Sequence, residues 1–333
     1  MRKLVRIASI VLLVAILTSA CGAGGGGGGD KPFRIAVVTP SAKNDLAFSQ
    51  SIYESLLKVQ QAMGGPEKLE FVISENMFVV DDAGAAIRDY ASQGYNLVIG
   101  HGSQYGGVLQ EIAPDFPKTS FAHGTTVDTF VDKGITNVFA YEARSEQGGY
   151  VNGVMAGALT KSNIIGVVGL IETGDAKLYV DGFVAGVKSQ NPNAQVNVNW
   201  IGSFSDVALA SEAAQTHVKA GADVMAGTAQ MVVGAIGVAK DNNALWFGTQ
   251  ASQTSLAPNA VVANQIYDWS GVITEIIDLI NKGTLGGQAF QITLANKGLY
   301  IEYNTAYNLP AEVKDLAEAT VDAIVTGAIN VAP

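Results

Sequence analysis

The chain has 333 residues, with 30 acidic and 20 basic side chains and a formal net charge of −10 at pH 7. This acidic balance excludes nucleic acid and anionic membrane surfaces as preferred partners, because both attract basic patches. A chain of this length exceeds a single typical core, so we expect two lobes. Low charge content, 38 glycines and abundant Ala and Val favour an α/β protein with buried parallel strands.

The N-terminus has the features of an exported and tethered protein. Three cations within the first six residues precede an uncharged, mostly apolar run at 7–20, which is shorter than the ~20 apolar residues of a membrane span. The chain's only cysteine, Cys21, follows small residues, and glycines fill positions 24–29. The segment resembles a bacterial lipoprotein signal, which predicts a signal peptide at 1–20, lipid on Cys21 and a flexible tether over 21–31. An ordinary cleaved signal peptide and a retained anchor are the alternatives.

Strand and helix signals alternate after the tether. The apolar run 33–39 predicts a buried strand, and apolar residues at helical spacing over 48–63 predict a helix. The first half continues with expected strands at 69–74, 96–100, 119–122 and 137–140, and expected helices at 81–92 and 103–113.

The same alternation then restarts. Expected strands lie at 164–170, 195–201, 223–226, 245–248 and 261–264, and expected helices at 147–159, 177–189, 208–220, 232–240, 272–281 and 312–326. Two such halves predict two doubly wound lobes, in which a ligand binds beyond the carboxyl ends of the strands. The loops after positions 39, 100, 122, 171, 226, 248 and 264 are therefore the candidate binding loops.

Motifs for catalysis are absent from the sequence. It contains no phosphate-binding P-loop, no HExxH and no GxSxG, so we expect no enzyme and no cofactor. The glycine-rich run 100–106 departs from the dinucleotide fingerprint and predicts a strand-to-helix turn from which Ser103 or Gln104 faces a cleft.

Three histidines are candidates for a metal site. His101 and His123 both fall at strand ends and could meet at one rim, but a third ligand at a suitable spacing is lacking. His217 falls in an expected helix and is interpreted as a surface or packing residue. We therefore predict no metal site.

Aromatic and amide side chains near strand ends give the strongest ligand signal. They are Phe48, Tyr179, Phe183, Gln250, Gln253, Tyr267, Asp268 and Trp269. Flat rings with a few directed polar groups suit a planar heteroaromatic ligand, because stacking supplies contact area and the polar groups set orientation. Phe48 could instead be only the first core contact of its helix. Tyr179 and Phe183 share a helix face, so we expect one to pack and the other to face the cleft.

Several segments resemble one known family. Residues 44–50, Asn-Asp-Leu-Ala-Phe-Ser-Gln, resemble the DDxSFNQ segment of the basic membrane protein family of ABC-transporter substrate-binding lipoproteins, also called the purine nucleoside receptor family. The likeness continues at 93–100, 146–153, 182–187, 191–192, 202–206, 256–258 and in the tail from 310, which together cover nearly the whole chain after the tether.

The resemblance implies a type I periplasmic-binding-protein fold, with two doubly wound lobes joined by three crossovers and no catalysis. It implies a first lobe of 32–140 plus about 265–288, and a second lobe of 141–264 plus about 289–333. It further implies a purine ring held between aromatic side chains, with Phe48 stacking from the first lobe, Asp45 making a nearby polar contact and Tyr179 stacking from the second lobe.

The sequence also departs from the nucleoside-binding pattern of that family. Amides at Gln250 and Gln253 stand where such members carry aspartates that contact the ribose, and Asp268-Trp269 stands where a lysine is expected. A neutral amide and a single acid can recognise the edge of a base but match the hydroxyls of a sugar poorly. The sequence therefore favours a nucleobase, with a nucleoside kept open.

The prediction from sequence is a monomeric, lipid-anchored substrate-binding protein on the extracytoplasmic side of the cell membrane. It captures a purine base or nucleoside and passes it to an ABC permease, with no nucleic-acid partner. The alternatives are the same scaffold binding a sugar or another heteroaromatic solute for uptake or sensing, and an enzyme such as a nucleoside hydrolase. The predicted ligand-binding residues are Asn44, Asp45, Phe48, Ser103, Gln104, His123, Tyr179, Gln230, Gln250, Tyr267, Asp268 and Trp269.

Overall fold

The computed structural model of the protein describes residues 31–332. The predicted signal peptide, Cys21 and the glycine run at 24–29 lie outside the described residues.

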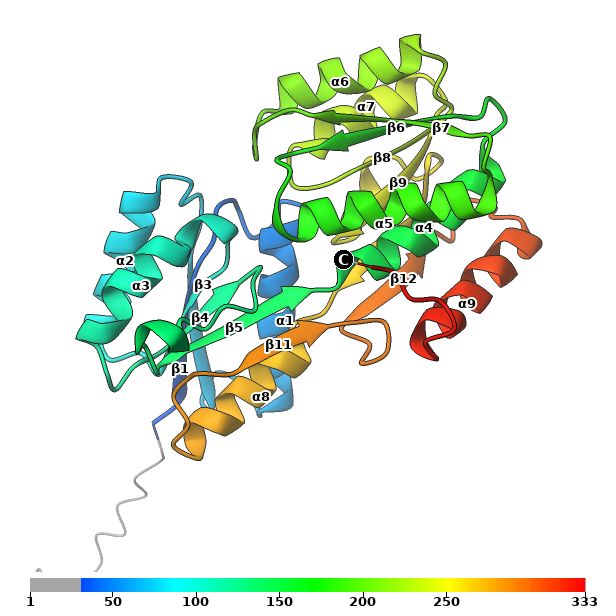
Figure 1. The fold of residues 1–333 in the computed structure, drawn as a ribbon. Coiled ribbons are helices and arrows are strands. Elements are labelled where there is room, and N and C mark those ends of the chain that lie inside the picture. Colours follow the sequence, from blue (N-terminus) through cyan, green and yellow to red (C-terminus); the bar gives the residue numbers. More distant parts are fainter. Residues whose placement is uncertain (1–30, 333) are drawn as a thin grey trace, which may run out of the picture. The chain divides into compact units, whose positions relative to one another are not determined.

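In the described range, the first sheet has six parallel strands in the order β11-β5-β4-β3-β1-β2 (Figure 1). The strands are β1 (Phe33–Val38), β2 (Leu69–Ser74), β3 (Leu97–Gly100), β4 (Ser120–Gly124), β5 (Val138–Ala143) and β11 (Ala289–Ile292). The flanking helices are α1 (Phe48–Ala62), α2 (Val80–Ser92), α3 (Gly106–Ile112) and α8 (Ser270–Asn281). Alternate residues of β1 pack in two separate clusters, one with α1 and α8 and the other with α2 and α3. Because helices cover both faces, the central strands β1 and β3 of this first lobe are apolar over nearly their whole length.

The second sheet of the described residues has the order β12-β10-β9-β8-β6-β7. Its strands are β6 (Ile164–Gly169), β7 (Gln195–Trp200), β8 (Val224–Gly227), β9 (Leu245–Gln250), β10 (Val261–Tyr267) and β12 (Leu299–Tyr303). β12 runs antiparallel to β10, and the other neighbours are parallel. The helices of this second lobe are α4 (Ser145–Leu159), α5 (Gly174–Gln190) and α9 (Ala311–Val325) on one face, and α6 (Val207–Lys219) and α7 (Val232–Asp241) on the other. The predicted α/β class with two doubly wound sheets is confirmed.

The described chain passes between the sheets after β5, after β10 and after β11. These crossovers lie three to four residues beyond the predicted positions 140, 264 and 288. Each of these strands stays paired with a neighbouring strand for a few residues past the predicted position. Residues 289–292, predicted for the second lobe, form β11 and pair with β5 in the first sheet. The sequence pattern missed β11 and β12 because both are short edge strands of mixed burial.

Helices α4 and α5 lie side by side (Figure 1) and pack backbone against backbone. A Cβ atom added at Gly153 would meet the carbonyl oxygen of Phe183, and one added at Gly182 would meet the carbonyl oxygen of Glu146. The glycine-rich composition of α4 therefore reflects this close approach, which no other residue type permits.

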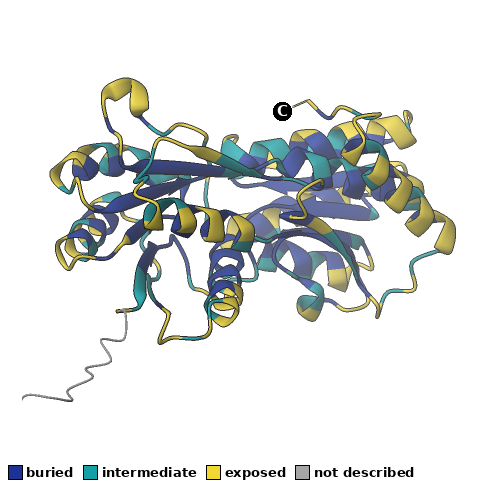
Figure 2. Ribbon diagram, turned by 90° about the horizontal axis from the view of Figure 1, so that it is seen from below, coloured by how far each residue is buried: buried dark blue, intermediate teal, exposed yellow. Residues whose placement is uncertain are grey.

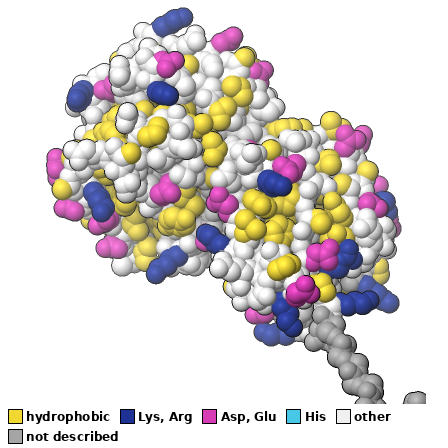
Figure 3. All heavy atoms as spheres, turned by 180° about the vertical axis from the view of Figure 1, so that it is seen from behind, with side chains coloured by type: hydrophobic (Ala, Val, Ile, Leu, Met, Phe, Trp, Pro, Cys, Tyr) yellow, Lys and Arg dark blue, Asp and Glu magenta, His cyan; other side chains and the backbone are white. Residues whose placement is uncertain are grey.

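Figure 2 shows that the strands are mostly buried and that the outer faces of the helices are exposed, as expected for sheets covered on both sides. On the face seen in Figure 3, acidic and basic side chains are interspersed and no histidine is visible. All three histidines of the sequence are buried.

Candidate functional site

Phe48 is the first residue of α1 and directly follows the loop that connects β1 to this helix. Its ring is 7% exposed and lies parallel to the His101 ring, with a centroid distance of 3.8 Å and an interplanar angle of 7°. The Trp269 ring approaches Phe48 edge-on at 6.5 Å and 85°. These contacts hold Phe48 in one orientation at the carboxyl edge of the first sheet, within the buried core cluster, and its stacking on a ligand stays a prediction.

His101 supports Phe48 as a neutral ring. Its Nε2 lies 3.2 Å from the Phe48 carbonyl oxygen, which can only accept, so Nε2 carries the proton. Its Nδ1 then accepts from the Tyr141 hydroxyl at 2.6 Å. Burial lowers the pKa of His101 to about 3, outweighing the hydrogen bond to Phe48, so the ring stays uncharged at neutral pH. His101 therefore acts as a platform beneath Phe48.

His123, at the end of β4, does not meet His101 in the way the sequence suggested. Its ring stacks on Phe130 at 5.8 Å, and neither ring nitrogen has a hydrogen-bond partner among the described residues. Burial lowers the pKa of His123 to about 4, so it offers one neutral donor and one acceptor. Within residues 31–332, no group of three His, Cys, Asp or Glu side chains is arranged to hold a metal.

Asp45 caps α1, and its predicted contact with a ligand stays a prediction. Its carboxylate accepts from the backbone amides of Ala47, Ser49 and Gln50 at 2.9–3.1 Å. It also accepts from the Ser41 hydroxyl. Both oxygens are thus used to satisfy the start of the helix. The neighbouring Asn44 is exposed, and its contact with a ligand stays a prediction.

At the carboxyl edge of the second sheet, three buried polar residues that follow or end different strands lie close together. Asp175 lies in the first turn of α5, after β6, while Gln250 and Tyr267 end β9 and β10. The Oδ2 atom of Asp175 accepts from the Tyr267 hydroxyl at 3.1 Å and from Gln250 Nε2 at 3.3 Å. Burial raises the pKa of Asp175, and these two hydrogen bonds oppose that rise. Asp175 is absent from the predicted ligand residues, although it lies just after position 171, which begins one of the predicted binding loops.

Unpaired polar atoms gather at the strand ends of both sheets. Gln250 Oε1, Gln230 Nε2 and Thr228 Oγ1 follow β8 or end β9, and Thr125 Oγ1 follows β4. In the described part of the chain each of these atoms is buried and has no hydrogen-bond partner. Buried polar groups are normally satisfied, so an accumulation of unsatisfied ones indicates that something else binds there.

The position of Tyr179 does not support the stacking on a purine ring that the resemblance implied. It is fully buried, and its hydroxyl accepts from Asn152 Nδ2 at 3.0 Å in the core of the second lobe. Burial raises the pKa of Tyr179. A ring enclosed on all sides cannot stack on a ligand. Phe204, on the loop after β7, is only partly buried and is the better aromatic candidate from the second lobe. Its place in the family-like segment 202–206 was the signal that could have identified it.

Asp268 and Trp269 lie in the crossover between the two lobes, and their predicted contacts with a ligand stay predictions. Asp268 Oδ2 pairs with Lys58 Nζ at 2.7 Å, and its Oδ1 accepts from the Ser270 amide at 3.0 Å. Burial raises the pKa of Asp268, but the bonds from Lys58 and Ser270 outweigh it and hold the pKa below its usual range. Trp269 is fully buried, and its Nε1 donates to Ser51 Oγ at 2.9 Å. Both side chains tie the β10–α8 crossover to α1.

The loops of the two lobes approach each other at Gln253. Its Nε2 contacts the Leu46 carbonyl oxygen of the first lobe at 3.4 Å, and its Oε1 accepts from Trp246 Nε1 at 2.8 Å. Ser103 and Gln104 lie on a short 3-10 turn after β3 and are partly buried, so their predicted roles remain open. The loop after β1 in the first lobe and the loop after β9 in the second lobe are therefore in contact.

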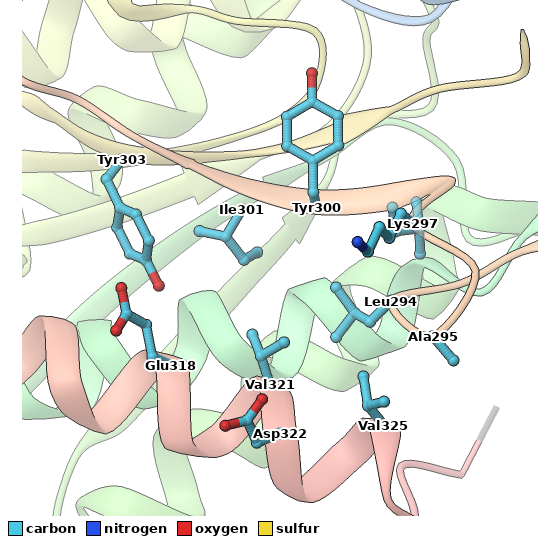
Figure 4. A pocket seen from close by; sticks show the side chains of 11 residues that line it. Leu294, Ala295, Lys297, Tyr300, Ile301, Tyr303, Glu318, Val321, Asp322 and Val325 are labelled. Carbon is cyan, nitrogen blue, oxygen red and sulfur yellow. The ribbon is translucent and has the colours of Figure 1, made fainter.

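A separate groove of about 680 Å³ lies at the edge of the second sheet, between β12 and α9 (Figure 4). Figure 4 shows Tyr303 pointing toward Glu318, while Tyr300 points away from α9. None of the predicted ligand residues lines this groove. Among the residues described, no helix is long and apolar enough to span a membrane.

Two doubly wound sheets joined by three crossovers define the two-lobed type I periplasmic-binding-protein fold. A solved structure of an ABC-transporter solute-binding protein from Conexibacter woesei has this fold. Its TM-score is 0.73 at 23% identity, and the match covers 90% of this chain and 98% of that chain. The fold predicted from sequence is confirmed.

The chain belongs to the family described as ABC transporter substrate-binding protein PnrA-like, whose model matches residues 33–331. The resemblance found in the sequence is thereby confirmed. The chain is 25% identical over 301 residues to a purine-binding protein of Brucella abortus, covering 90% of this chain and 83% of the relative. It is 28% identical over 324 residues to the ABC transporter nucleoside-binding protein BmpA of Lactococcus lactis, covering 90% and 88%. Substrate-binding proteins of this kind capture small molecules and deliver them to a membrane permease.

Proposed function

We propose that this protein captures a purine base or nucleoside between the strand-end loops of its two lobes. The observation that carries the proposal is the Phe48 ring, held over neutral His101 and against the edge of Trp269 at the carboxyl edge of the first sheet. In this proposal the face of Phe48 opposite His101 stacks on the base, because aromatic stacking suits any heteroaromatic ring. The names of the Brucella and Lactococcus relatives support the same ligand class.

The polar groups around this position favour a neutral ligand. His101 and His123 are uncharged at neutral pH, and the Asp45 carboxylate is already used by backbone amides. Unpaired amide groups at Gln230 and Gln250 are suited to the edge of a base. The proposal therefore places a free nucleobase first and a nucleoside second.

A ligand panel tests this proposal directly. Protein purified under denaturing conditions and refolded without ligand is melted with adenine, hypoxanthine, guanine, xanthine and their nucleosides, with glucose and ribose as controls. A ligand at 100 times its Kd adds about 2.7 kcal/mol of stability, so at least one purine is expected to raise the Tm by several degrees. A rise with a sugar alone, or with none of the compounds, rules out purine capture.

We infer from the sequence that Cys21 carries the lipid anchor and that the following glycines let the monomer reorient on the extracytoplasmic membrane surface. Such a tether raises the local concentration of the receptor near its permease. Cells expressing the full chain and fed labelled palmitate are expected to label it, whereas a Cys21→Ser variant stays unlabelled. Equal labelling of the two chains, or labelling of neither, contradicts the inference.

A further inference from the structure

Four neighbouring strands of the second sheet place one polar side chain each at the same edge. In the sheet order β10-β9-β8-β6, these side chains are Tyr267, Gln250, Gln230 and Asp175. Tyr267 and Gln250 are the last residues of their strands, whereas Gln230 and Asp175 lie on the segments that follow theirs. The carboxyl ends of parallel strands meet at one edge, so these groups form a single row.

Asp175 determines which way the Gln250 amide faces. Its Oδ2 accepts from both the Tyr267 hydroxyl and Gln250 Nε2, at 3.1 and 3.3 Å. An acceptor oxygen requires the NH2 end of the amide to point toward it, so the amide oxygen Oε1 must point the other way. Gln250 is 3% exposed, and within residues 31–332 its Oε1 has no hydrogen-bond partner.

The backbone at Gln250 supports a functional role. Its φ angle is 77°, a left-handed conformation that glycine adopts more easily than a branched or long side chain. Strained backbone of this kind persists at sites where a side chain must be held in place. The amide is thus fixed by both its backbone and its hydrogen bond to Asp175.

We propose that Asp175 is a positioning residue that turns the Gln250 amide so that Oε1 accepts a hydrogen bond from the ligand. This inference rests on the proposed function and specifies its ligand, which must present an N–H donor to this position. On the adjacent strand end, Gln230 Nε2 is a buried donor without a partner in the described chain. The ligand edge therefore combines an N–H with a nearby acceptor atom, as the edges of neutral nucleobases do.

N-methylated purines test this arrangement. The affinities of hypoxanthine, xanthine and adenine are compared with those of their 1-, 3-, 7- and 9-methyl derivatives by calorimetry. For wild-type protein, methylation at one N–H is expected to weaken binding about 10-fold or more, because it leaves a buried acceptor unpaired. In Gln250→Met, the ratio between parent and methyl derivative is expected to fall toward one.

Asp175→Ala tests the positioning role. Alanine removes the acceptor that holds Gln250 Nε2, so the amide is free to turn and present either end to the ligand, and the ratio between parent and methyl derivative is expected to fall toward one here as well. A merely structural role would lower both affinities equally and leave the ratio unchanged. The control is Gln195→Met. Gln195 is exposed and lies at the amino end of β7, which is the opposite edge of the sheet from this row, so this variant should keep the wild-type ratio.

The outcomes separate the two levels of the proposal. If the parent purines bind but the ratio in Gln250→Met or in Asp175→Ala is that of the wild type, the inference is overturned and the proposed function stands. If no parent purine binds the wild type, the proposed function fails and the inference with it. Should Asp175→Ala fail to fold, as judged by circular dichroism, the Gln250→Met ratio alone decides for or against the hydrogen bond.

Discussion

Gly153→Ala is expected to destabilise the second lobe by about 3 kcal/mol or more. The added methyl group would meet the carbonyl oxygen of Phe183 in the neighbouring helix α5. A flexible side chain could move aside, but this obstacle is backbone. The same interlocking recurs at Gly149, Gly182 and Gly186, so the two helices cannot slide to relieve the clash without creating another.

Urea or thermal unfolding followed by circular dichroism measures this effect. The matched control is Gly237→Ala in α7, where an added Cβ meets no atom within 4 Å. That substitution should leave packing intact and stabilise the protein by roughly 0.5–1 kcal/mol, because alanine favours a helix over glycine. If Gly153→Ala melts like the wild type, α4 and α5 are not packed backbone against backbone as described.

Phe48→Leu is expected to weaken purine binding by about 10- to 100-fold, since base–aromatic stacking contributes roughly 1–3 kcal/mol. Leucine keeps most of the volume over His101 but has no flat π face. It is therefore a cleaner test than alanine, which would also leave a cavity in the core around Trp269. Calorimetry with the best purine of the panel gives the affinity.

Phe71→Leu serves as the control for the loss of an aromatic ring. Phe71 lies within β2 and packs edge-on against Tyr53 at 6.2 Å. Its substitution should change stability slightly and affinity not at all. Wild-type affinity in Phe48→Leu would remove the stacking contact from the proposal, whatever the effect on stability.

Residue types near strand ends located candidate residues but did not show which of their polar atoms are already paired within the protein. Asp45, Asp268 and Trp269 have the right chemistry at the right places in the sequence. In the structure they cap α1 or tie the lobes together, because their polar atoms find partners within the protein. Whether a polar side chain is free for a ligand depends on its neighbours from other strands, and the sequence does not contain that information.

Asp175 shows the opposite case. On its own it is one acid at the start of a helix, with nothing to distinguish it from Asp206 or Glu312. Only the order of the strands brings it beside Gln250 and Tyr267, which lie far away in the sequence. Phe204 is similar. Its ring is partly exposed whereas that of Tyr179 is enclosed, and only the fold shows this difference.

By itself, the sequence determined the two alternating halves, the buried strands and the family, because the period of apolar residues and the local motifs are properties of short segments. The tertiary structure alone decided the exact positions of the crossovers, the edge strands β11 and β12, and which polar atoms remain unpaired. Those features depend on pairing between distant segments. A hydrogen bond is satisfied or left open by whichever residue the fold places opposite it.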